Sequence, residues 1–315
     1  MIIRWSLAEL PGVFEQLGVE RPFVVASPRW TVDVPAVGRW SEVPSHRIEV
    51  PPEADSLLAW GGGSAIDTAH AASAATGLPV ISVPTTYSGA EWTTGFGIRS
   101  PDRHMVSGGG GAHLAAIVYD VDLTLDLPRA ETVGTALNAL AHCAEALYVR
   151  PSPEGDRAAL AGAERIARSL PAVAASPHDR DARTELLLGA ANGGEALSLT
   201  GLGLAHAMAQ AVGGRFGLPH GAMNALCLPP ALAFNERFVP DAVARFGAAI
   251  GGAGDAVGAV RTLALLGGFE RLSQFGMAED ALHEVAALAA ARPGNLANPQ
   301  PATPAEIEEL YRSVW

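Results

Sequence analysis

The sequence predicts an α/β domain that is followed by an all-helical domain. Over the first third of the 315-residue chain, short apolar runs alternate with turn-forming residues, which is the pattern of buried strands joined by loops. From Pro128 onward the apolar residues recur instead at i, i+3 and i+4, as they do in amphipathic helices. We therefore expect an α/β domain over 1–128 and a helical domain over 129–315, with a ligand site in the cleft between them.

Four apolar runs predict the strands of the α/β domain. They cover residues 22–26, 56–60, 78–83 and 115–120. The second run leads into the glycine turn Gly61-Gly62-Gly63-Ser64, which is followed by a helical pattern over 65–76. Strand, glycine turn, helix and strand in this order form a βαβ unit with parallel strands.

The helical domain is predicted from segments whose apolar residues share one face. The clearest segments cover residues 129–149, 153–174, 181–198 and 204–212. The chain shows no internal repeat and few low-complexity runs.

Composition and charge exclude several classes of protein. The chain has 21 basic and 33 acidic residues, and its formal net charge of −12 argues against nucleic acid or an anionic membrane as a partner. All 21 basic residues are arginines. A chain without lysine is not a Schiff-base or pyridoxal-phosphate enzyme, a P-loop NTPase or a protein kinase, because each of these needs a lysine.

Cysteine usage and hydropathy predict where the protein resides. Cys143 and Cys227 lie in apolar stretches of a chain that is too long to need disulfides. Glycine, proline or charge interrupts every apolar stretch before the ~18 residues that a membrane span needs. The residues after Met1 do not continue into the apolar region of a signal peptide. We therefore expect a soluble, globular protein of the reducing cytoplasm.

The glycine turn is a candidate phosphate site. A turn that closes a strand and opens a helix directs backbone N–H groups and the positive helix end at one place, and glycine lets an anion approach the main chain. Residues 84–91 follow the next strand, where their hydroxyl groups can hold phosphate or ribose. Purely structural interpretations also stay open. The glycine turn, which is not GxGxxG, can be only a tight turn, residues 84–91 can be only a polar loop, and Asp67 can be a helix cap.

A second group of candidate residues lies in the helical domain. Asn138 and His142 are four residues apart and share one face of a predicted helix, with Glu145 one turn further on. His206 and His220 follow on later elements. Three imidazoles in one domain suit a Zn, Fe or Ni site, although each histidine taken singly is more often a structural residue.

The order and spacing of these motifs resemble the iron-containing (group III) alcohol dehydrogenase family, of the dehydroquinate synthase-like superfamily. The similar segments span the chain: 61–70, 84–86, 138–148, His206, 218–221 and 298–301. The resemblance implies a Rossmann-like domain that binds NAD(P), an all-α helical domain that holds the substrate and a divalent metal (Fe or Zn), and a homodimer. A hydride would then pass between the nicotinamide and a carbonyl or alcohol.

Two sets of site residues follow from this resemblance. The cofactor-binding set is Gly61, Gly62, Gly63, Ser64, Asp67, Thr85, Thr86 and Ser88. The catalytic set is Asn138, His142, His206 and His220, and its three histidines are also the candidate metal ligands.

Within the family, the chain looks most like the maleylacetate reductases. The similar stretches are 84–93, 138–142 and 213–220. Family alcohol dehydrogenases carry aspartate where this chain has Asn138, and an amide is a poorer metal ligand than a carboxylate. Metal dependence is therefore open. Without a metal, the imidazoles would polarise a ketone or donate a proton.

Several positions depart from the family pattern. His70 and His104 stand where the family has lysine, and Gln210 replaces a histidine. Residues 31–52 contain several prolines and no clear helix, as though a βα piece of the nucleotide domain were missing. No acidic residue follows the first predicted strand to bind the ribose of NAD, and Arg29 would favour a 2′-phosphate.

Three functions are open at this point. The first is an NAD(P)H-dependent reductase that converts maleylacetate, a 2-ene-4-oxo dicarboxylate, to 3-oxoadipate in aromatic degradation. The second is a metal-dependent dehydrogenase of small alcohols or aldehydes, in which Asn138 or water completes the metal shell. The third is a non-redox binding protein or diverged enzyme, because a fold does not guarantee a reaction.

Overall fold

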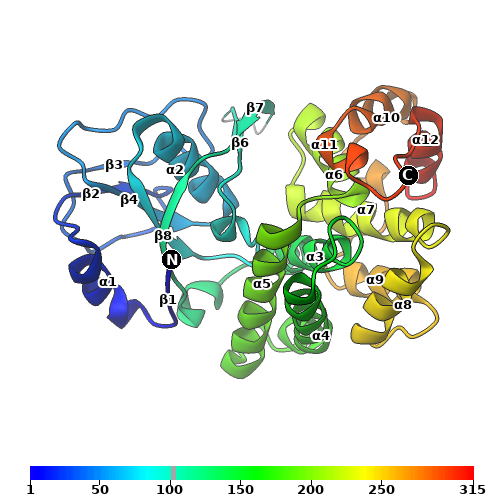
Figure 1. Ribbon diagram of the computed structural model, residues 1–315, viewed down its shortest axis with the longest axis horizontal. Coiled ribbons are helices and arrows are strands. Elements are labelled where there is room, and N and C mark those ends of the chain that lie inside the picture. The colour runs from blue at the N-terminus through cyan, green and yellow to red at the C-terminus, as the bar shows by residue number, and fades with distance from the viewer. Residues whose placement is uncertain (101–103) are drawn as a thin grey trace. The chain divides into compact units, whose positions relative to one another are not determined.

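The computed structural model describes residues 1–100 and 104–315 (Figure 1). The chain divides into two compact units, which we call the α/β unit (Met1–Leu127) and the helical unit (Pro128–Trp315). The first holds a parallel sheet with helices, and the second is built from helices, so the predicted fold class is confirmed. No helix in the described part of the chain is long and apolar enough to cross a membrane.

The sheet of the α/β unit has six parallel strands in the order β1-β8-β5-β4-β2-β3. Their bounds are β1 Ile2–Arg4, β2 Pro22–Val25, β3 Gly38–Trp40, β4 Ser56–Gly61, β5 Pro79–Pro84 and β8 His113–Val118. The four predicted strands are present as β2, β4, β5 and β8. The edge strands β1 and β3 are not predicted, because three residues are too few to show a periodicity.

Side chains of the central strands alternate between the two faces of the sheet. Leu58 packs with α1 (Leu10–Leu17) on one face, whereas its neighbour Leu57 packs with α2 (Gly63–Thr76) on the other. Both leucines are fully buried. Burial of each such side chain stabilises the fold by ~2 kcal/mol. β4 and β5 are paired in the sheet, so their carboxyl ends lie side by side.

Shorter elements complete the α/β unit. They are η1 Leu7–Glu9, η2 Ala90–Trp92, η3 Val121–Thr124 and the antiparallel hairpin of β6 Phe96–Arg99 with β7 Met105–Gly109. Residues 31–52, all of which the structure describes, contain β3 as their only helix or strand. Arg39 of β3 orders the loop after β2, since its Nη2 donates to the carbonyls of Ala26, Ser27 and Trp30 at 3.2, 2.6 and 2.9 Å.

The helical unit is arranged around a buried helix, α3. Its α-helices are α3 Arg129–Ala146, α4 Pro153–Ala175, α5 Arg180–Thr200, α6 Leu204–Phe216, α7 His220–Asn235, α8 Pro240–Ala249, α9 Ala256–Leu265, α10 Leu282–Ala290, α11 Pro293–Leu296 and α12 Pro304–Arg312, with 3₁₀ turns η4 Leu272–Phe275 and η5 Glu279–Ala281. From Thr132 to Ala146 nearly every residue of α3 is buried.

Helices α3 and α7 touch through their backbones. A Cβ on Gly221 would lie only 2.5 Å from the carbonyl carbon of Gly134, so only glycine fits there. This close approach brings polar side chains of the two helices within hydrogen-bonding reach of each other.

Candidate functional site

The glycine turn at the end of β4 forms a cradle of backbone groups. Gly61 has a φ of 153°, and Gly62 caps α2 without any side-chain hydrogen bond. A Cβ on Gly62 would lie 2.7 Å from Cγ2 of Thr86, which explains why glycine is needed. The backbone N–H groups at the start of α2 are therefore not covered by a side chain of the glycine turn itself.

Hydroxyl groups without partners lie beside this cradle. Thr85 and Thr86 follow β5, and the backbone N–H of Thr85 donates to the carbonyl of Gly61 at 3.0 Å. Both Oγ1 atoms are buried and have no hydrogen-bond partner among the described residues. Such orphaned groups cost ~1–3 kcal/mol each, which a ligand oxygen would recover. The cradle and its orphaned hydroxyls therefore fit the pyrophosphate of a dinucleotide.

The remaining predicted cofactor residues differ in their surroundings. Ser88 lies 3.6 Å from the position of a Cβ on Gly63, so it belongs to the cradle. Ser64 lies in the first turn of α2. Asp67 does not cap α2, because it accepts the N–H of Gly97 in β6 at 3.3 Å. Burial raises the pKa of Asp67 to about 7.

The two histidines that replace family lysines are not equivalent to lysine. His70 is fully buried, its Nδ1 lies 3.4 Å from the carbonyl of Gly95, and burial lowers its pKa to about 4. It is therefore neutral at neutral pH and offers no charge to a phosphate. His104 directly precedes β7, and its carbonyl accepts the N–H of Ser100 at 3.0 Å.

The structure brings the predicted catalytic residues together in the helical unit. Asn138 and His142 come from α3, His206 from α6, and His220 from the start of α7. The rings of His142 and His206 stack at 4.6 Å between centroids, and those of His206 and His220 lie 5.9 Å apart. We call these four residues, with Glu145 and Asn224, the histidine cluster.

Asn224 links the cluster through its amide group. Its Nδ2 donates to Oδ1 of Asn138 at 2.7 Å and lies 3.0 Å from Nε2 of His220. Nε2 of His206 lies 3.3 Å from the same Asn138 oxygen. Asn224 is fully buried and is not predicted by the sequence analysis, although its i+4 spacing from His220 repeats that of Asn138 and His142.

Glu145 closes the network on the other side of His206. Its Oε1 accepts the backbone N–H of His206 at 3.0 Å, and its Oε2 lies 2.7 Å from Nδ1 of the same residue. Burial, with the neighbouring His206 and His220, lowers the pKa of His142 well below its ordinary value. His142 is therefore a neutral imidazole.

The donor set does not fit a divalent metal in this arrangement. Within residues 1–100 and 104–315, no three His, Cys, Asp or Glu side chains are grouped to hold a metal ion. The Asn138 oxygen and the His220 nitrogen that would face a metal are engaged instead by the amide hydrogens of Asn224. The His220 nitrogen has a single lone pair, which cannot bind an amide hydrogen and a cation at once.

Gln210 lies outside the cluster. It follows His206 by one turn of α6, but its Oε1 accepts a hydrogen bond from Arg292 at 3.3 Å. The replacement of a family histidine therefore removes an imidazole from this helix without adding a group to the network.

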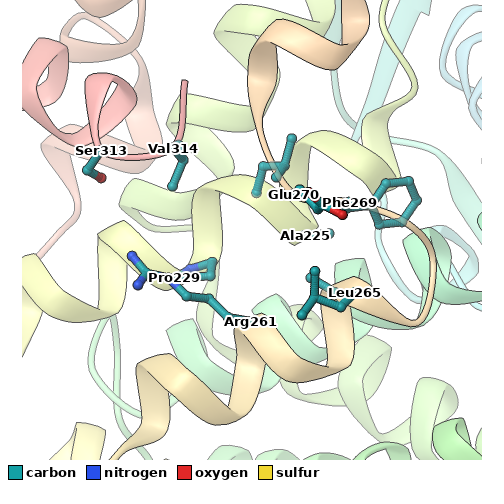
Figure 2. Close-up of a pocket in the computed structure, with 10 residues that line it drawn as sticks. Ala225, Pro229, Arg261, Leu265, Phe269, Glu270, Ser313 and Val314 are labelled. Atoms are coloured by element: carbon teal, nitrogen blue, oxygen red, sulfur yellow. The ribbon is translucent and has the colours of Figure 1, made fainter.

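The helical unit also contains a cavity of about 350 Å³ that is separate from these residues. Figure 2 shows that Ala225 and Pro229 of α7, Arg261 of α9, and Phe269 and Val314 line it. The lining is mainly apolar and includes none of the predicted site residues.

Comparison with known proteins identifies the family. The profile of the iron-containing alcohol dehydrogenase family matches residues 50–120, and that of the Fe-containing alcohol dehydrogenase family, C-terminal, matches residues 132–315. A maleylacetate reductase of Sphingobium indicum is 36% identical, with 82% of this chain and 73% of that protein covered. Maleylacetate reductase 1 of Cupriavidus pinatubonensis is 32% identical, with 98% and 93% covered.

Solved structures agree with these matches. The crystal structure of maleylacetate reductase from Agrobacterium tumefaciens has a TM-score of 0.87 and 29% identity, with 100% of this chain and 95% of that chain covered. A 1,3-propanediol oxidoreductase has a TM-score of 0.89 with 100% and 98% covered, but its 21% identity shows the fold alone. The chain belongs to the iron-containing alcohol dehydrogenase family, a family of oxidoreductases that includes maleylacetate reductases.

Proposed function

We propose that this protein is an NAD(P)H-dependent reductase that converts maleylacetate to 3-oxoadipate. The observation that carries the proposal is the buried network of amides and imidazoles centred on Asn138, where family alcohol dehydrogenases carry aspartate. The relatives that match over most of the chain are named maleylacetate reductases, which supports the same assignment.

The α/β unit is the proposed cofactor-binding domain. The pyrophosphate of NAD(P)H would contact the backbone of Gly61, Gly62 and Gly63 and the hydroxyls of Thr85 and Thr86, for which the orphaned oxygens and the lack of side chains on the turn are the support. Ser64, Asp67 and Ser88 complete the proposed set. The bound cofactor supplies the hydride.

The helical unit is the proposed substrate domain. Reduction of a 2-ene-4-oxo dicarboxylate moves electron density from the double bond onto the ketone oxygen, which needs hydrogen-bond donors, and a proton must then reach the adjacent carbon. The proposed donors are the buried groups of the histidine cluster. The two carboxylates of the substrate need arginines, histidines or helix N-termini, because the chain has no lysine.

We infer further that the protein is a homodimer of the cytoplasm. The homodimer follows from the family resemblance, and sedimentation equilibrium tests it. Cys143 and Cys227 are both buried free thiols, which suits a reducing compartment.

The deciding experiment measures oxidation of NADH and of NADPH with maleylacetate in excess chelator, after the bound metal has been assayed. We expect turnover under chelation. Activity that appears only with simple aldehydes after addition of Fe²⁺ or Zn²⁺ would replace the proposal by a metal-dependent alcohol dehydrogenase. Failure to bind either dinucleotide in a titration would indicate a non-redox protein.

A further inference from the structure

Glu145 is a buried carboxylate that the proposed reaction does not yet use. It lies on α3, one turn after His142, and it is completely buried. A buried carboxylate is costly unless it is paired and hydrogen-bonded. Both of its oxygens are directed at one residue, His206: Oε1 to the backbone N–H and Oε2 to the ring Nδ1.

The start of α6 is built to receive this carboxylate. The N-cap of α6 is Gly203, which has no side chain to accept the free N–H groups of the first turn. A Cβ on Gly203 would lie 3.1 Å from Oε1 of Glu145. Glu145 therefore performs, from α3, the capping role that an N-cap side chain usually performs, and the positive end of α6 stabilises its charge.

The same contact determines the hydrogen positions on His206. A carboxylate only accepts hydrogen bonds, so Nδ1 carries a hydrogen. On the other side of the ring, Nε2 faces Oδ1 of Asn138, an oxygen that already accepts from Asn224.

His206 is therefore held by Glu145 through its backbone N–H and its ring Nδ1, while its Nε2 lies 3.3 Å from the Asn138 oxygen. The other imidazoles against it are those of His142, at 4.6 Å, and His220, at 5.9 Å. Stacking against His142 leaves the ring edge, with Nδ1 and Nε2, as the part that interacts with polar groups.

We propose that Glu145 is a positioning residue, which holds His206 from α3 by its backbone N–H and Nδ1 and keeps the Nε2 edge of the ring directed at Asn138. The role in turnover rests on the proposed function, in which the histidine cluster contacts the ketone oxygen of the substrate. The hydrogen bonds between Glu145 and His206 are a property of this chain alone, so they can be tested without any ligand.

The test is ¹⁵N NMR of the histidine side chains of the full chain, with Glu145→Gln as the variant. In the wild-type protein Nδ1 of His206 should show an attached hydrogen. The glutamine amide has one accepting oxygen for two donors, so one of its hydrogens must face Nδ1 or the backbone N–H. We expect Nδ1 of His206 to lose its hydrogen in the variant, and kcat to fall on the order of 10²-fold with KM for the dinucleotide unchanged.

Two further variants separate this role from a general loss of structure. Gly203→Ala keeps every charge but crowds Oε1 of Glu145, so it should shift the same His206 signals even if Glu145→Gln does not fold. Glu164→Gln makes the same chemical change on the exposed face of α4, where 65% of the side-chain surface is accessible, and should alter neither the spectrum nor kcat.

The outcomes are distinct. A wild-type spectrum in which Nδ1 of His206 carries no hydrogen, or His206 signals that Glu145→Gln leaves unchanged, would overturn the positioning role. If the spectra are as expected but the protein does not turn over maleylacetate, the positioning of His206 stands and the proposed function is wrong.

Discussion

The two candidate sites of this protein are built from different kinds of chemical group. In the α/β unit, backbone N–H groups and threonine hydroxyls come from two loops that follow neighbouring strands, β4 and β5. In the helical unit, the site consists of side chains from three helices, from Asn138 on α3 through α6 to Asn224 on α7. Shape limits the first site, since a Cβ added to Gly62 would collide with Thr86, whereas hydrogen-bond donors and acceptors organise the second.

The largest effect should come from the imidazole that contacts most of the cluster. His206→Asn removes both the donor to Glu145 and the contact with Asn138. We expect kcat with maleylacetate to fall about 10³-fold, while the Kd for the dinucleotide changes less than about 2-fold. Steady-state kinetics and a fluorescence titration measure the two quantities. Gln210→Ala, one turn further along α6, is the matched control and should keep kcat near the wild-type value.

The glycine turn should respond to shape alone. Gly62→Ala places a Cβ 2.7 Å from Cγ2 of Thr86, so the turn must shift. We expect the Kd for the dinucleotide to rise about 10²-fold, or ~2.7 kcal/mol. Thr86→Ser removes that methyl group and keeps the hydroxyl, so Gly62→Ala combined with Thr86→Ser should recover most of the binding. A double variant as weak as Gly62→Ala would refute the steric explanation.

Two buried glutamates offer a second contrast. Glu145 is paired with an imidazole, but Glu91 accepts from the neutral hydroxyl of Tyr119, at 2.8 Å, and its Oε2 has no partner among the described residues. Burial raises the pKa of Glu91 to about 7. Between its ordinary value of 4.5 and about 7, the folded chain binds this proton and the unfolded chain does not. The Glu91 contribution to stability is therefore lost as the pH rises through this window.

Glu91→Gln should remove this pH dependence, because glutamine keeps an accepting oxygen for Tyr119 and does not ionise. Urea unfolding at pH 5 and pH 8 should show that the wild-type protein loses about 2 kcal/mol more than the variant between these conditions. Glu53→Gln changes an exposed carboxyl of the same unit and should behave as wild type. Equal pH dependence in the wild type and Glu91→Gln would show that Glu91 does not hold a proton in the fold.

The smallest effect concerns the choice between NADH and NADPH. Arg29 is exposed, and its guanidinium lies 5.1 Å from the ring centroid of Trp30, in the loop that Arg39 orders. If Arg29 contacts a 2′-phosphate, Arg29→Ala should raise KM for NADPH about 5-fold and leave KM for NADH unchanged, since an exposed ion pair is worth ~1 kcal/mol. Arg47→Ala is the control, and equal changes for both cofactors would exclude the contact.

The local features of both units were accessible from the sequence. The run at 56–60, the glycines after it and the helical pattern that follows are adjacent in the chain, so the βαβ unit needs no long-range information. The spacing of Asn138 and His142 likewise places both on one helix face. β1 and β3 could not be predicted in this way, because three-residue strands are defined by their partners rather than by their own pattern.

Only the tertiary structure decided what the candidate residues do. Asn224 enters the site because α7 touches α3 at Gly221, and Glu145 acts on His206 because α6 begins beside it. His70 is neutral because it is buried, which no residue type reveals. The sequence determined which secondary structures form and which residue types are present, since periodicity and composition are local. Hydrogen-bond partners and buried charges depend on contacts between distant segments, so they were decided by the packing of the helices and the sheet.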